Sequence, residues 1–256
     1  MRWFRRAPVL HVAVDEGSGP PVVLLHGIAS SYVTFANVIP LISDDHRVIA
    51  LDLLGFGSSP SPDGATYSLE EHAAAVLRTL RRLKVRHPVV LVGHSMGALI
   101  AIRIAATRPR RVSKLVVVSP PVYVTPDAVG DWRDRAALGA YLRVYDYLRS
   151  NKQFTMRAAA GLARLSPIKN LLEVSERNWT PFVLSLEHAI ESQTTVSDLA
   201  RVRAPIDLVY GSIDPFLAPA GIKLAESMRR VTAHRVEGGD HVIRKRMARV
   251  VAAAIG

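Results

Sequence analysis

Residues 89–97 read Val-Val-Leu-Val-Gly-His-Ser-Met-Gly. The four apolar residues that open this stretch are typical of a strand covered by helices on both faces, because no polar residue alternates with them. Gly93-x-Ser95-x-Gly97 follows directly, and an apolar run with helical spacing begins after it. Small glycines on either side of the serine let strand and helix approach closely at a sharp turn, which exposes the hydroxyl above the sheet. We therefore predict that Ser95 is a nucleophile.

Short apolar runs alternate with helical patterns over most of the chain. This alternation is typical of parallel strands joined by crossover helices and predicts a doubly wound, mostly parallel α/β sheet. One helix is marked by Ser68 and Glu71, which form a capping box ahead of apolar residues at helical spacing. The predicted strands are Val9–Val14, Val22–His26, Arg47–Asp52, Val89–Gly93, Lys114–Ser119, Asp207–Gly211 and His234–Glu237.

The alternation stops between residues 121 and 204. This stretch contains aromatic-rich helical patterns and no convincing strand, and the next strand begins after Pro205. An insertion between two strands of an open α/β sheet is expected above the carboxyl ends of the strands, where such sheets bind ligands. We predict a core domain made of residues 1–120 and 205–256 and a helical lid made of residues 121–204.

A serine hydroxyl needs a base that takes its proton and an acid that orients this base. Downstream, one predicted strand runs into Asp214 and the last one runs into Asp240-His241. Both segments follow strand ends, as Ser95 does, so we predict His241 as the base and Asp214 as the acid. Asp240 is the rival acid, but neighbouring residues rarely point toward each other as such a pair requires.

Together these residues resemble the α/β-hydrolase family. The resemblance covers nearly the whole chain and rests on His26-Gly27, Asp52-x-x-Gly55-x-Gly57-x-Ser59, Gly93-His94-Ser95-Met96-Gly97, Asp214 and His241, in this order. It implies that Ser95 attacks an acyl carbon, that His241 transfers the proton and that Asp214 holds the imidazole. It further implies an oxyanion hole made by the main-chain N–H groups of Met96 and Ile28, a helical cap in the inserted stretch, and no cofactor.

The family and the serine favour hydrolysis of a small-molecule carboxylic ester with a small to medium acyl group, through an acyl-enzyme. Thioester or acyl-carrier ester hydrolysis, carbon–carbon bond hydrolysis and cofactor-free perhydrolysis stay open, since the same triad serves all of them. Epoxide hydrolases and haloalkane dehalogenases are disfavoured, because they carry an aspartate where this chain has Ser95. A non-enzymatic ligand sensor with this fold is the remaining alternative, and it is expected to lack a triad member.

Other polar residues of these motifs receive structural roles. We expect His26 and His94 to shape loops by hydrogen bonding and Asp52 to brace a turn by accepting backbone N–H bonds. A metal at Asp52 would need further carboxylates nearby, and the sequence has none there. We therefore predict no metal site.

Composition excludes several classes of protein. The 256 residues hold no cysteine, which excludes a disulfide framework and a thiolate nucleophile and favours a cytoplasmic location. No apolar stretch reaches the ~18 residues that a membrane-spanning helix needs, and the N-terminus does not resemble a signal peptide. The net charge is +11, but no nucleic-acid-binding motif accompanies it, so we expect a solvated basic surface and no specific nucleic-acid partner.

The predicted lid is unevenly charged. Between residues 133 and 169 only two aspartates oppose the cations, for a net charge of +6. This surface is either a solvated helical face or a docking surface for an acidic substrate or carrier protein. The lid aromatics either line an acyl pocket or form the lid's own core. The eight cations are Arg133, Arg135, Arg143, Arg149, Lys152, Arg157, Arg164 and Lys169.

Overall fold

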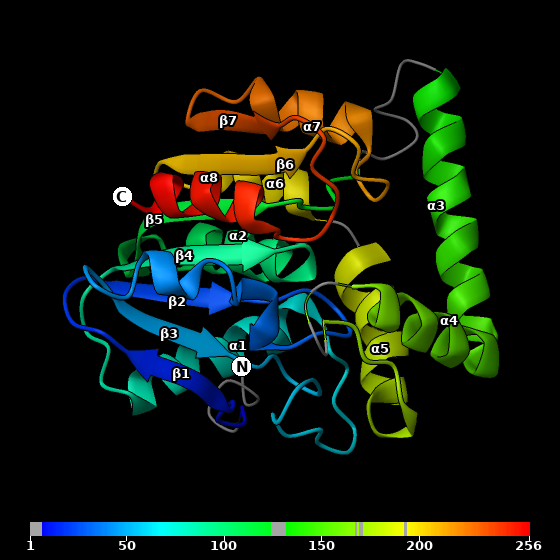
Figure 1. The fold of residues 1–256 in the computed structure, drawn as a ribbon, viewed down its shortest axis with the longest axis horizontal. Helices are drawn as coiled ribbons and strands as arrows, with labels where there is room; N and C mark the ends of the chain where they lie inside the picture. The colour runs from blue at the N-terminus through cyan, green and yellow to red at the C-terminus, as the bar shows by residue number, and fades with distance from the viewer. Residues whose placement is uncertain (1–6, 124–131, 167, 169–170, 192–193) are drawn as a thin grey trace.

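A computed structural model describes residues 7–123, 132–166, 168, 171–191 and 194–256. Seven strands form one sheet in the order β1-β3-β2-β4-β5-β6-β7, in which only the β1–β3 pair is antiparallel (Figure 1). This confirms the predicted doubly wound, mostly parallel sheet. The strands are β1 Val12–Glu16, β2 Pro21–Leu25, β3 Arg47–Leu51, β4 Val89–His94, β5 Val112–Val118, β6 Ile206–Gly211 and β7 Val231–Val236.

Strand boundaries differ most from the prediction at the two edges of the sheet. β1 begins at Val12 because the preceding chain contacts a helix, with the Leu10 amide donating to Thr79 Oγ1 at 2.8 Å. β7 begins at Val231, three residues before the predicted start, because the first part of this edge strand is exposed or half-buried and carries no apolar run. An edge strand covered on fewer sides leaves a weaker pattern in the sequence.

Helices cover both faces of the sheet (Figure 1). Successive strand residues serve opposite faces, so that Leu91 packs with the α1 and α2 side and Val92 with the α8 side. This two-sided burial explains why the central strands are apolar at every position. The helices of the core are α1 Leu69–Arg82, α2 Met96–Thr107, α7 Pro219–Glu226 and α8 Lys245–Ile255, with short 3₁₀ helices at Tyr32–Phe35, Ile39–Leu41 and Pro109–Arg111.

The start of α1 departs in one detail from a standard capping box. Ser68 Oγ accepts the Glu71 N–H, as expected. The Glu71 carboxylate, however, accepts the N–H groups of Thr66 and Tyr67, at 2.7 and 2.9 Å, in place of that of Ser68. The Glu71 side chain thus fixes the approach of the chain to the helix, and the Ser68 side chain fixes its first turn.

The stretch between β5 and β6 is helical, and its described residues contain no strand. Figure 1 shows α3, α4 and α5 beyond the arrowheads of the strands, at the end of the sheet where the β4–α2 turn lies. The elements are α3 Trp132–Ser150, α4 Lys152–Leu165, a 3₁₀ turn Glu176–Asn178, α5 Trp179–Ser185, a π-helical turn Leu186–Glu191 and α6 Thr195–Arg201. None of the helices in the described ranges has the combination of length and apolar character that crossing a bilayer requires.

Candidate active site

Ser95 occupies a strained turn between β4 and α2. Its φ and ψ are 54° and −122°, outside the regions that residues with a side chain prefer. Both flanking glycines are sterically required: a Cβ on Gly93 would lie 2.3 Å from the Gly97 carbonyl oxygen, and one on Gly97 would lie 2.2 Å from that of Leu25. The Ser95 N–H donates to Val118 O at 2.9 Å, which ties the turn to β5. The sheet and the helix therefore force the serine into this conformation.

Asp214 and His241 are brought together from the ends of β6 and β7. His241 Nδ1 lies 2.8 Å from Asp214 Oδ2 and 3.0 Å from Oδ1. Burial raises the pKa of Asp214, but the bonds from His241 and from the Phe216 N–H outweigh burial, and the pKa lies below its usual value. A charged carboxylate only accepts hydrogen bonds, so Nδ1 of His241 carries the hydrogen. In a neutral His241, Nε2 is then the basic nitrogen.

Glycines also lock the loops that carry the acid and the histidine against each other. A Cβ on Gly211 would lie 2.1 Å from the Gly239 carbonyl oxygen, so only glycine allows this approach. The Ile213 N–H donates to the same oxygen at 3.0 Å, and the Gly238 N–H donates to Ser212 Oγ at 2.8 Å. The relative position of Asp214 and His241 is therefore fixed mainly by backbone contacts.

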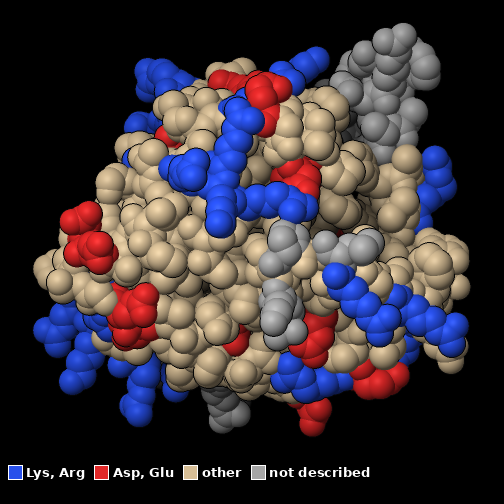
Figure 2. All heavy atoms as spheres, viewed as in Figure 1, with Lys and Arg blue, Asp and Glu red and all other residues tan. Residues whose placement is uncertain are grey.

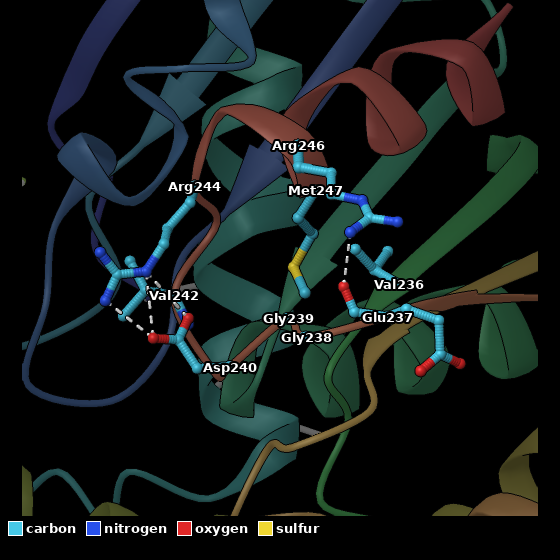
Figure 3. Close-up of a pocket in the computed structure, with 9 residues that line it drawn as sticks. All are labelled: Val236, Glu237, Gly238, Gly239, Asp240, Val242, Arg244, Arg246 and Met247. Atoms are coloured by element: carbon cyan, nitrogen blue, oxygen red, sulfur yellow. Dashed lines mark hydrogen bonds and ion pairs between the residues drawn. The ribbon is translucent and has the colours of Figure 1, made fainter.

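The rival acid Asp240 points to other partners. Its carboxylate accepts the Val242 N–H at 3.1 Å and pairs with Arg244 at 2.8 Å (Figure 3). A pocket of about 180 Å³ lies beside this pair, and none of Ser95, Asp214 and His241 lines it. Asp240 and this pocket thus belong to the connection between β7 and α8, outside the catalytic arrangement.

His94 connects the serine turn to the histidine loop. Its Nε2 lies 2.8 Å from the main-chain oxygen of His241, and the two rings have centroids 4.8 Å apart. A carbonyl oxygen only accepts, so Nε2 carries the proton; burial lowers the pKa of His94 to about 3 and keeps the ring neutral. In the described contacts Ser95 Oγ makes no hydrogen bond, and catalytic bonds often close only when substrate binds.

The two predicted oxyanion donors are set by different parts of the chain. Met96 is the first residue of α2, so its N–H has no acceptor within the helix. His26 Nδ1 donates to Gly27 O at 2.7 Å, while its Nε2 accepts the Leu53 N–H at 2.8 Å. Because C=O and N–H of a trans peptide point in opposite directions, this bond turns the Ile28 N–H to the other side of the peptide.

Gly27 and His26 place that peptide against Ser95. A Cβ on Gly27 would lie 3.1 Å from Ser95 Cβ, so the chain passes directly beside the serine. Burial lowers the pKa of His26 to about 4, although its bond to Gly27 works in the other direction, and the ring stays neutral. A neutral ring with one donor and one acceptor nitrogen satisfies both of its backbone partners.

Asp52 braces two turns, as its motif predicts. Its Oδ1 accepts the Tyr32 N–H at 3.0 Å, and its Oδ2 accepts the Ser58 N–H at 2.9 Å. His11 Nδ1 also lies 3.0 Å from Oδ2. Within the described residues, no group of three or more His, Cys, Asp or Glu side chains is arranged to hold a metal ion.

One tyrosine from the inserted stretch reaches the acid loop, which sequence patterns did not indicate. Tyr141 of α3 donates to the carbonyl oxygen of Pro215 at 2.9 Å, directly after Asp214. Tyr123 and Tyr145 share a buried hydroxyl–hydroxyl bond of 2.5 Å, and burial raises the pKa of Tyr145 to about 12. The Phe216 ring lies 4.7 Å from the His241 ring. Of these contacts, only that of Phe216 with His241 could have been suspected from the sequence, because Phe216 lies two residues after Asp214.

Comparison with known proteins identifies the family. A family model described as alpha/beta hydrolase fold matches residues 20–243. A haloalkane dehalogenase from Mycolicibacterium paratuberculosis is 30% identical over 236 residues, which cover 81% of this chain and 72% of that protein. The probable lysophospholipase BODYGUARD 1 from Arabidopsis thaliana is 36% identical over 123 residues, which cover 45% of this chain and 26% of that protein. This chain therefore spans only about a quarter of the plant protein.

A solved structure agrees at the level of the fold. The crystal structure of a loop variant of the haloalkane dehalogenase DbeA-M1 from Bradyrhizobium elkanii matches with a TM-score of 0.71 at 21% identity, and the match covers 96% of this chain and 95% of that one. The family and the relative named as a probable lysophospholipase support a hydrolase. On the family model and on the dehalogenase match, both of which cover most of its length, the chain belongs to the alpha/beta-hydrolase fold family.

Proposed function

We propose that the protein is a serine hydrolase that cleaves carboxylic esters through an acyl-enzyme. One observation carries the proposal: Ser95 stands on a strained strand-to-helix turn whose neighbour His94 is bonded to His241, and His241 in turn pairs with a buried, charged Asp214. An orienting acid, a histidine with a free Nε2 and a serine on a strand-to-helix turn are what nucleophilic acyl transfer requires.

The proposed reaction has two halves. Ser95 Oγ attacks the ester carbonyl carbon while His241 Nε2 takes its proton, and the N–H groups of Met96 and Ile28 stabilise the negative oxygen. The C–O bond of the ester then breaks, and His241 gives the proton to the departing alcohol. In the second half, water attacks the carbonyl carbon of the acyl-enzyme while His241 takes a proton from the water. His241 then gives this proton to Ser95 Oγ, which releases the carboxylic acid and restores Ser95. Asp214 stabilises the charged imidazole in both halves.

Dehalogenation is not part of this proposal, although both haloalkane dehalogenases described above match this chain over most of its length. Displacement of a halide from carbon forms an alkyl ester on the enzyme, and water must then attack the carbonyl of that ester. A carboxylate nucleophile supplies such a carbonyl and a serine does not. Ser95 at the turn therefore favours acyl substrates.

We propose that residues 121–204 act as a lid over this site. Support comes from the bond between Tyr141 of α3 and the main chain beside Asp214, which links the inserted helices to the acid loop. Partly buried Trp179 and buried Phe182, with centroids 5.8 Å apart, pack in the main core cluster. This packing favours a structural role for these two aromatics in the main core over a role in an acyl pocket.

An acidic substrate or carrier at the lid remains a weaker proposal. Two of the lid cations are already paired, Arg149 with Glu191 at 2.7 Å and Lys152 with Glu176 at 2.6 Å. The side chains of Arg133, Arg135 and Lys169 lie outside the described residues. The exposed cations that remain, without a carboxylate partner in the described ranges, are Arg143, Arg157 and Arg164. A small-molecule ester is therefore the proposed substrate class.

Two measurements test the proposal together. A fluorophosphonate should label Ser95, identified by peptide mapping, and labelling should fail in His241→Ala because the hydroxyl loses its base. A panel of nitrophenyl esters of graded acyl length, run beside thioesters and an aryl diketone, should give the highest kcat/KM on an ester. Equal labelling of the two proteins would remove His241 as the base, and faster turnover of the thioester or the diketone would reassign the reaction.

A further inference from the structure

The positive charge of the protein is concentrated in one part of the chain. Between Glu71 and Asp127 the sequence contains ten Lys or Arg and no acidic residue. Arg103 and Lys114 pair with carboxylates from other segments. Most of the others lie at the C-terminal end of α1 and in the turns before β4 and β5.

The sheet brings arginines from two further turns to the same side. β4, β5, β6 and β7 are parallel neighbours, so the turns that precede them lie along one edge. Each of these four turns carries exposed arginine. Together with the end of α1 they form a surface that we name the basic edge: Arg81, Arg82, Lys84, Arg86, Arg108, Arg110, Arg111, Arg203, Arg229 and Arg230.

The charges of the basic edge are not compensated within the described residues. No carboxylate there lies within 4.0 Å of any of its members. Arg111 donates to the main-chain oxygens of Val85 and Arg86, which ties the turn before β5 to the turn before β4. Asp207, at the start of β6, is occupied by Lys114 and His234. Like charges gathered in this way repel one another and attract polyanions.

The basic edge lies opposite the candidate active site. Ser95 follows the carboxyl end of β4, whereas Arg86 precedes its amino end, and a six-residue strand separates the two by about 20 Å. Figure 2 shows Lys and Arg side chains at the lower left and upper left margins, the side from which the arrows of the parallel strands in Figure 1 start. The turn before β3 carries exposed Asp44 and Asp45 instead of arginine. Negative charge therefore lies before β3 and positive charge lies before β4 to β7, on the same side of the sheet.

We propose that the basic edge binds the surface of an anionic lipid bilayer, with the active-site end of the sheet facing away from it. Two observations favour a bilayer over nucleic acid or an acidic protein. The turns of the basic edge contain no Phe, Tyr or Trp on which bases could stack. The cations come from four turns and the end of α1 and are spread along a whole edge of the sheet, which suits an extended anionic surface better than a single acidic segment.

The test compares two charge-matched variants of the whole chain. Arg82→Glu, Lys84→Glu, Arg86→Glu and Arg110→Glu reverse four exposed cations of the basic edge; Arg143→Glu, Arg157→Glu, Arg164→Glu and Lys245→Glu reverse four exposed cations elsewhere. Both carry the same net charge. Cosedimentation is measured with phosphatidylcholine vesicles, with and without ~30% phosphatidylglycerol, at ~150 mM salt, and retention by single-stranded RNA is measured in parallel.

The wild-type chain should bind the anionic vesicles at least tenfold more tightly than neutral ones, and the basic-edge variant should lose at least tenfold of that binding while the control variant keeps it. Melting temperatures should stay equal to or above that of the wild type, because reversing clustered cations removes repulsion. Equal losses in both variants would reduce the effect to net charge and overturn the proposal. Tighter binding to RNA than to vesicles, lost in the basic-edge variant, would assign the surface to nucleic acid. Binding at this surface does not depend on which bond Ser95 cleaves.

Discussion

His94 Nε2 lies 2.8 Å from the main-chain oxygen of His241, so the residue before the proposed nucleophile is bonded to the residue proposed as its base. This bond spans 147 positions of sequence and joins the end of β4 to the loop after β7. Serine and histidine must be held to a few tenths of an ångström for proton transfer, and side chains on two separate loops need such a connection. His94 therefore acts through His241 as a positioning residue.

Removal of the donor on His94 should lower catalysis without unfolding the protein. In His94→Leu we expect kcat to fall roughly 10- to 100-fold with little change in KM, since a loop shift of about 1 Å misplaces the base. His94→Gln, whose amide N–H can replace the donor, should recover most of the rate. Fluorophosphonate labelling rates and ester kinetics check this. Identical losses in both variants would assign a packing role to the ring.

The two candidate acids can be separated by matched substitutions. Asp214→Asn should lower kcat roughly 10⁴-fold, because the amide no longer stabilises the imidazolium or holds the Nδ1–H tautomer. Asp240→Asn should stay within threefold of the wild type, since its carboxylate serves Arg244 and the Val242 N–H. Steady-state kinetics on one nitrophenyl ester suffice. A large loss in Asp240→Asn alone would reverse the assignment.

Ser95→Ala should abolish ester hydrolysis and leave the fold intact. The turn is imposed by Gly93, Gly97 and the sheet, so removal of one oxygen leaves its geometry in place. Residual activity should lie below about one part in a hundred of the wild type. Circular dichroism and a melting curve provide the control. Higher residual turnover with an intact fold would mean that Ser95 is not the nucleophile.

Three buried histidines should make the protein sensitive to acid. Burial lowers the pKa values of His26, His72 and His94 from 6.5 to about 4, 3 and 3. Below pH 6.5 the unfolded chain binds protons that the folded chain refuses, so stability is full above this pH and is lost as the pH falls toward 4. Each histidine should contribute up to about 1.4 kcal/mol per pH unit to the slope of the unfolding free energy.

His72 allows this slope to be measured away from the catalytic residues. His72→Gln should reduce the slope between pH 6 and pH 4 by about a third, and His87→Gln, at an exposed position, should leave it unchanged. Urea unfolding at several pH values gives the slopes. A slope that is the same in all three proteins would show that His72 becomes protonated without unfolding.

Salt dependence tests whether the lid receives an acidic substrate. If it does, kcat/KM for a carrier-bound ester should fall steeply between low and physiological salt, and a small neutral ester should barely respond, because exposed charges are screened beyond ~8–10 Å. Arg143→Glu, Arg157→Glu and Arg164→Glu together should reproduce the loss for the carrier-bound ester alone. Arg82→Glu, Lys84→Glu and Arg110→Glu form the control, with the same charge change on another face. Parallel responses of both esters would leave the lid as a solvated face.

The sequence by itself determined the type of sheet and the residues that end its strands. Apolar runs without alternation mark strands covered on both sides, and Gly93, Ser95 and Gly97 mark a turn whose chemistry is local. His241 and Asp214 were identified because parallel strands place their ends on one edge whatever the details of packing. Such signals depend only on neighbouring residues or on the order of elements, so a single sequence contains them.

Only the tertiary structure decided which distant groups meet. The bond of His94 to His241, the reach of Tyr141 to Pro215 and the pairing of Arg149 with Glu191 join segments that no spacing rule relates. The basic edge arises in the same way, because the order β4-β5-β6-β7 places Arg86 and Arg230 on one side of the sheet although 143 positions separate them. Contacts of this kind depend on how helices and loops pack on the sheet, and packing is a property of the whole chain, which local patterns do not encode.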